Sequence, residues 1–119
     1  MAEMLHEGVG VSELAVEVNG EKSVVRLEAE AYKIGRAETN QLCFPIAGLS
    51  REHLAIERQG GFWIARDLGS TNGTLLNGEQ LAGRHLLHSG DRIQAGPVTL
   101  TFRDPETAEP WSGTQQARA

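Results

Sequence analysis

The chain alternates apolar and polar residues in short runs, and this period of two restricts it to β-strands. Three of the runs, around residues 14–18, 54–57 and 98–103, place apolar side chains on one face and polar side chains on the other. No stretch keeps an apolar period of 3.6 residues over three turns. Turn-forming pairs follow the runs: Asn19-Gly20, Gly60-Gly61, Asn77-Gly78 and Gly96-Pro97. The pattern predicts an all-β domain.

Strands and turns of this kind, recurring about every 8–12 residues, are typical of a β-sandwich or a β-barrel. A chain of 119 residues is long enough for one domain with a real core. The pattern covers residues 12–103. We expect residues 1–11 to form a flexible acidic arm, and residues 104–119 to be a disordered tail or the stub of a linker, because neither segment alternates.

The net charge of −5 is unevenly distributed. Residues 31–103 carry eight basic against six acidic side chains, whereas the segments before and after them are acidic. Broad nucleic-acid binding needs an extended basic surface, so the charge argues against it and favours one small anion as ligand. Cys43 is the only cysteine, and neither a signal peptide nor a membrane-spanning run is visible. We therefore expect a cytoplasmic protein without membrane partners.

Three loop-like segments between the expected strands hold the chemistry. They are Gly35-Arg36, Ser50-Arg51-Glu52-His53 and the segment 67–74, which contains Thr71 and Asn72. Together they offer guanidiniums, hydroxyls and an amide, which are the donors that a phosphate group needs. Loops held by a rigid sheet can aim such donors at one point. The segments predict a site for a phosphate carried by a partner peptide.

The order and spacing of these segments resemble the forkhead-associated (FHA) domain family over about residues 12–103. The resemblance implies an antiparallel β-sandwich of about eleven strands with its binding loops at one end, and non-catalytic recognition of phosphothreonine peptides. It implies that Arg36 is the principal phosphate ligand, that the Ser50 hydroxyl donates to the same phosphate and that Arg51 assists. Thr71 would close over the phosphothreonine, and Asn72 would bond the peptide backbone.

Four further residues would have structural roles by the same resemblance. His53 would tie the loops together without touching phosphate, and Gly35, Gly73 and Thr74 would be architectural. Specificity along the peptide would depend on residues 47–49, just before the second-loop serine. None of these three is charged, which argues against a strong charge-based preference.

Other functions fit the sequence less well. Ser50, His53 and Asp67 have the composition of a hydrolase triad, but no Gly-x-Ser-x-Gly elbow surrounds the serine. His85 and His88 lack further metal ligands, and no P-loop lysine is present, so we expect no metal and no cofactor. The expected activity is therefore binding and not catalysis.

The expected partner is a threonine-phosphorylated protein or neighbouring domain downstream of a Ser/Thr kinase, and the compact loops suggest a bacterial origin. The alternative is a phospho-independent scaffold that uses a sheet face. A self-binding switch through Thr107 or Thr114 of the tail stays open.

Overall fold

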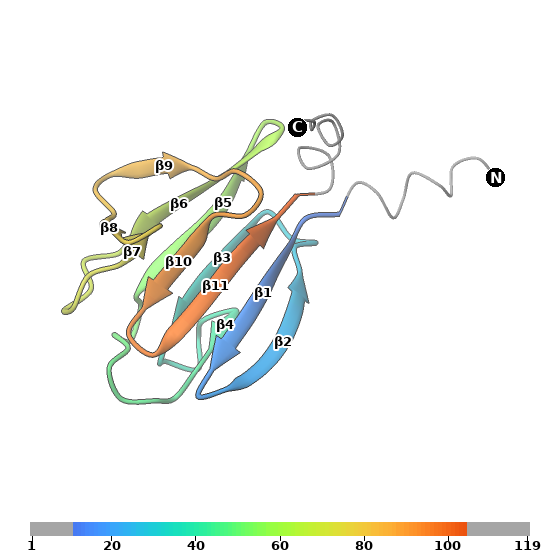
Figure 1. Cartoon of the computed structure of the whole chain (residues 1–119). Helices are drawn as coiled ribbons and strands as arrows, with labels where there is room; N and C mark the ends of the chain where they lie inside the picture. Colours follow the sequence, from blue (N-terminus) through green and yellow to red (C-terminus); the bar gives the residue numbers. More distant parts are fainter. Residues whose placement is uncertain (1–10, 105–119) are drawn as a thin grey trace.

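The computed structural model describes residues 11–104, which form two β-sheets with no helix between residues 11 and 104. Figure 1 shows the two sheets packed against each other as a sandwich. The strands of the first sheet are β1 (Glu13–Val18), β2 (Glu21–Arg26), β7 (Leu75–Leu76), β8 (Glu79–Gln80), β10 (Arg92–Ala95) and β11 (Val98–Arg103). The strands of the second sheet are β3 (Ala31–Gly35), β4 (Leu42–Cys43), β5 (Leu54–Gln59), β6 (Phe62–Asp67) and β9 (Arg84–Leu86). The predicted sandwich of about eleven strands is confirmed.

Short hairpins define the register of the first sheet, which has the order β2-β1-β11-β10-β7-β8. Asn19-Gly20 joins β1 to β2 with φ angles of 52° and 85°, and Asn77-Gly78 joins β7 to β8 with 53° and 86°. Positive φ at both central residues is the requirement of a type I′ turn, whose twist matches that of the flanking strands. Both Asn-Gly predictions are confirmed.

The second sheet, with the order β4-β3-β5-β6-β9, contains one departure from the expectation. The fold is not wholly antiparallel, because β4 runs parallel to β3. Ile34 pairs with Leu42 and Gly35 with Cys43, so the chain leaves β3, loops through residues 36–41 and returns in the same direction. The pairing is only two residues long, and alternation along one strand does not indicate the direction of its neighbour.

The core lies between the sheets and is built from the alternating positions. Leu14, Ile34, Leu54, Ile93 and Leu100 are each 0% exposed. Removing such side chains from water supplies the main favourable term in folding, at about 25 cal/mol per Å² of apolar area. The sandwich is therefore a rigid support for the loops at its ends.

The two ends of the sandwich are formed by different parts of the chain. Glu13 pairs with Arg103, so β1 begins where β11 ends, and Figure 1 shows the two strand ends together. The other end carries the β10–β11 turn at Gly96-Pro97, which lies against Gly48 of the segment between β4 and β5. The predicted arm and tail fall almost entirely outside the described residues. Within 11–104 no helix is long and apolar enough to cross a membrane.

Candidate functional site

Three loops meet at the Gly48 end of the sandwich. We call them the first loop (residues 36–41, after β3), the second loop (44–53, before β5) and the third loop (68–74, after β6). The first loop is joined to the second by main-chain hydrogen bonds from Arg36 N to Ser50 O, at 2.9 Å, and from Ala37 N to Arg51 O, at 3.1 Å. The Nε atom of Arg36 also donates to Leu49 O at 3.1 Å. This bond fixes the guanidinium at the loop junction, and its terminal nitrogens make no hydrogen bond to the described residues.

Gly35 lets the first and second loops approach closely. Its φ is not positive, so backbone freedom is not what makes glycine necessary there. A Cβ at this position would overlap the carbonyl oxygen of Arg51 and lie 2.9 Å from Nδ2 of Asn40. Asn40 is buried, and its Nδ2 donates to Ala37 O at 2.8 Å and to Arg51 O at 2.7 Å. We did not predict Asn40, because an asparagine in a loop looks like an ordinary turn residue.

His53 joins the second loop to the third and is 0% exposed. Its Nδ1 accepts the Ser50 amide hydrogen at 3.1 Å, so Nδ1 carries no proton. The proton is therefore on Nε2, which donates to Gly73 O at 2.8 Å. The imidazole contacts the Ser50 main chain and not its hydroxyl, an arrangement that gives Ser50 no general base. The triad by composition has no triad geometry.

The Ser50 hydroxyl is oriented from the third loop. Its oxygen accepts the Thr71 amide hydrogen at 3.0 Å, which leaves the hydroxyl proton able to donate to a ligand. Asn72 is exposed at the tip of the third loop, and its Nδ2 lies 3.5 Å from Gly48 O, a long and weak contact. Thr71 is exposed beside it. The loop contacts thus bring Arg36, Ser50, Thr71 and Asn72 to one end of the sandwich.

Asp67 organises the third loop, a role that we did not assign from the sequence. Its Oδ1 accepts the hydroxyls of Ser70, at 2.5 Å, and Thr74, at 2.6 Å, and its Oδ2 accepts the amides of Gly69 and Ser70, each at 2.9 Å. Burial by itself raises the pKa of Asp67, but these hydrogen bonds outweigh it and hold the pKa below the ordinary range. The buried Thr74 thus has a donor role within the loop.

A hollow of about 580 Å³ opens beside the loop junction. It is lined by Arg36, Ala37, Glu38, Thr39, Pro45 and Arg51. Two guanidiniums and one carboxylate therefore border it, and Arg51 and Glu38 form no ion pair with any described residue. The first and second loops supply all of its lining, and the third loop supplies none. The balance of charge favours an anion.

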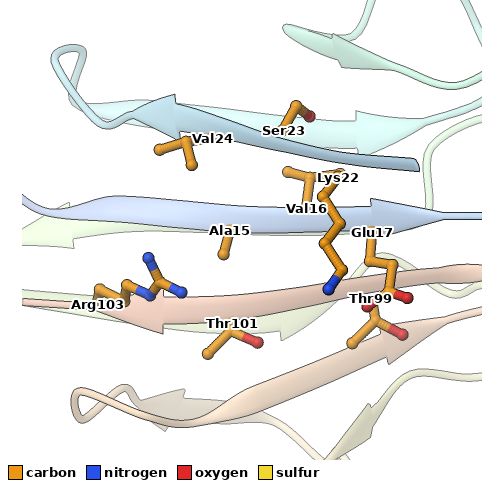
Figure 2. A pocket seen from close by; sticks show the side chains of 9 residues that line it. All are labelled: Ala15, Val16, Glu17, Lys22, Ser23, Val24, Thr99, Thr101 and Arg103. Carbon is orange, nitrogen blue, oxygen red and sulfur yellow. The ribbon is translucent and has the colours of Figure 1, made fainter. Parts of the chain in front are cut away.

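A second hollow, of about 340 Å³, lies on the outer face of β1, β2 and β11, away from the loops. Figure 2 shows the small Ala15 in the middle of this face, with Val24, Thr101 and Arg103 around it. Val24 is 55% exposed, although it is apolar. Lys22 extends beside Glu17 and Thr99 (Figure 2). This face is the one to which a scaffold function would be assigned.

The described residues offer no metal centre, since no three His, Cys, Asp or Glu side chains come together among them. His88 and Asp91 form a weak pair, with Nδ1 and Oδ2 3.8 Å apart, and His85 is exposed on β9. Among residues 11–104, neither histidine is hydrogen-bonded to a residue of the three loops. The loop site instead offers guanidinium, hydroxyl and amide donors.

Comparison with known proteins gives a consistent answer. The family model of the FHA domain matches residues 32–96. The FHA domain-containing protein At4g14490 of Arabidopsis thaliana is 42% identical over 70 residues, which cover 56% of this chain and 18% of the plant protein. The chain thus spans less than a fifth of that relative.

Two solved structures from Mycobacterium tuberculosis are also similar. The FHA domain of FhaA, complexed with the intracellular domain of Rv3910, has a TM-score of 0.70 and 32% identity, and covers 77% of this chain and 99% of that one. EmbR, in complex with a low-affinity phosphopeptide, has a TM-score of 0.71 and 29% identity, and covers 80% of this chain and 24% of that one. With the family model matching more than half of its residues, this chain belongs to the FHA domain family.

Proposed function

We propose that this domain binds phosphothreonine peptides without catalysing a reaction. It would thereby join a kinase-modified protein or domain to the protein that contains this FHA domain. The observation that carries the proposal is the junction of three hydrogen-bonded loops, where Arg36, Ser50 and Arg51 present donors beside a hollow. Solved relatives include FHA domains in phosphothreonine-dependent interactions. The proposed setting is a bacterial cytoplasm, which the lone Cys43 thiol suits.

Arg36 is the proposed principal phosphate ligand. Because Nε is bonded to Leu49 O, the terminal nitrogens are presented in a fixed plane, and a planar fork can donate two parallel bonds to a phosphate. Ser50 adds a hydroxyl donor and Arg51 a second guanidinium. Hydrogen bonds to charged groups contribute about 1.5–3 kcal/mol each. Three or four of them account for most of the roughly 8 kcal/mol of a micromolar complex.

The third loop supplies the remaining contacts. Asn72, with only a long contact to Gly48, has an amide available for the peptide main chain. Thr71 closes beside the phosphothreonine, whose methyl group distinguishes it from phosphoserine. Burial of one methyl contributes about 0.8 kcal/mol, a factor of about four in affinity. A larger preference for threonine has to come from peptide orientation.

A second candidate function is phosphate-independent binding of a partner through the outer face of β1, β2 and β11. The exposed Val24 and the hollow over Ala15 favour it. This function makes the opposite predictions about phosphate, salt and Arg36. Affinity at the loop site should fall as salt rises, because salt screens exposed charges.

Calorimetric titration with phosphothreonine, phosphoserine and unphosphorylated peptide pools tests the proposal. Arg36→Ala should abolish binding, and Arg26→Ala, which removes an exposed guanidinium from β2, should leave it intact. Binding that ignores phosphate and survives Arg36→Ala, but is lost in Val24→Glu, would instead establish the sheet face as the functional surface.

A further inference from the structure

The loop site has two unequal sides. On one side the third loop crosses the second, through the contacts from Thr71 to Ser50 and from Asn72 to Gly48. On the other side the first loop, together with Pro45 and Arg51 of the second loop, borders the open hollow. A peptide whose phosphate lies at Arg36 and whose backbone reaches Asn72 therefore sends its other flank, or a side chain on that flank, toward the hollow.

The hollow is larger than one phosphate needs. At about 580 Å³, it has room for a neighbouring side chain as well. A residue two or three positions from the phosphothreonine, on the flank that runs toward the hollow, lies about 7–10 Å away in an extended peptide. Its side chain can therefore reach the hollow. Its occupant has to match the groups that the phosphate leaves unused.

Charge decides which occupant matches. A phosphate carries about −1.5 to −2 charge and engages both guanidiniums, Arg36 and Arg51. Glu38 then remains at the rim as a carboxylate with no ion pair to any described residue. A second acidic group would compete for the same guanidiniums and meet Glu38, whereas a cation would meet only Glu38.

We infer that Glu38 is a specificity-determining residue that selects a lysine or arginine on the peptide flank directed away from Asn72. The stem of that side chain would pack on Pro45 and Ala37, and its cation would pair with the Glu38 carboxylate. This inference rests on the proposed function. It also differs from the expectation for residues 47–49, because the discriminating charge lies in the first loop and not in the second.

The test compares phosphothreonine peptides that place one lysine, alanine or glutamate at each of three positions before and after the phosphothreonine. Glu38 is exposed, and its side chain makes no hydrogen bond to any of residues 11–104, so Glu38→Gln and Glu38→Lys should fold; circular dichroism checks this. Glu17→Gln, on the outer sheet face, is the control with the same charge change. Arg36→Ala reports on the phosphate site itself.

For the wild type, lysine on one flank should raise affinity roughly 1.4- to 5-fold, the range of exposed ion pairs. Glu38→Gln should remove this preference, Glu38→Lys should convert it into a preference for glutamate, and Glu17→Gln should keep it. A flank preference that is absent, or that survives both Glu38 variants while Arg36→Ala still abolishes binding, overturns the inference but leaves the proposed function. Affinity independent of phosphate and of Arg36 overturns both.

Discussion

Replacing Gly35 by alanine tests whether glycine is needed there for close packing of the loops and not for backbone freedom. The added Cβ would overlap the Arg51 carbonyl oxygen and lie 2.8 Å from its carbon, so the second loop has to move. Overpacking of this kind costs about 1–3 kcal/mol. The same oxygen accepts hydrogen bonds from Ala37 N and Asn40 Nδ2, and their weakening adds about 0.5–1.5 kcal/mol each. The expected loss of stability is about 2–6 kcal/mol.

Gly61→Ala is the matched control, because Gly61 also lacks a positive φ and a Cβ there would meet no atom within 4 Å. It should stay within about 1 kcal/mol of the wild type, on the stabilising side, because alanine lowers the entropy of the unfolded chain. Urea denaturation measures both variants, and peptide titration in native buffer measures the displacement of Arg51. Equal midpoints for the two variants would refute the steric argument.

Three further substitutions test the loop architecture. Asp67→Asn should lower stability by about 1–3 kcal/mol at neutral pH. The folded-state pKa of this carboxyl is depressed, so its contribution to stability is present above the unfolded pKa of about 3.9 and is lost as pH falls through the folded-state pKa. The urea midpoints of variant and wild type should therefore converge below about pH 4. A gap between them that does not change with pH contradicts this. Gly96→Ala should destabilise more than Gly20→Ala, because both glycines have positive φ but only a Cβ at Gly96 would overlap the Gly48 carbonyl; equal thermal midpoints exclude the contact. His53→Phe keeps ring volume but leaves the bridged amide and carbonyl unpaired, and should cost about 2–5 kcal/mol by urea denaturation and weaken peptide binding.

The sequence predicted those features that local chemistry determines. Asn19-Gly20 and Asn77-Gly78 form the expected hairpins because only residues that tolerate positive φ fit a type I′ turn. The strand faces follow from alternation, as in β11, where Val98, Leu100 and Phe102 are buried. Each of these signals involves residues close together in the chain, so it can be recognised in the sequence without knowledge of the fold.

Features that depend on long-range contacts were not predicted. The parallel pairing of β4 with β3 follows from the path of the first loop, which no local pattern records. Asn40 looked like a turn residue, yet its Nδ2 donates to Arg51 O of the second loop. Asp67 is a different case, because its partners Gly69, Ser70 and Thr74 are local in the sequence and its role was missed all the same. Gly35 was expected to be architectural, and the physical reason, an ordinary φ with the Arg51 carbonyl close by, is visible only in the fold.

The candidate site residues were named by resemblance to a family, and their roles stay predictions. Arg36, Ser50 and Thr71 lie on three different loops, and only the sandwich brings them together. Glu38 was left out because a lone exposed glutamate carries no signal in a sequence. Its position in the hollow became visible only from the folded loops.

The pairing of the first strand with the last also determines how the domain would respond to mechanical force. Glu13 faces Arg103 at the open end of the β1–β11 ladder, with 3.6 Å between the Glu13 Oε2 and Arg103 Nη1 atoms of their ion pair. Tension applied through both chain ends would load the antiparallel hydrogen bonds one after another, in an unzipping geometry, instead of shearing them all at once. Such a load would therefore separate β1 from β11 starting at the Glu13–Arg103 pair. The three loops at the Gly48 end of the sandwich would be loaded last.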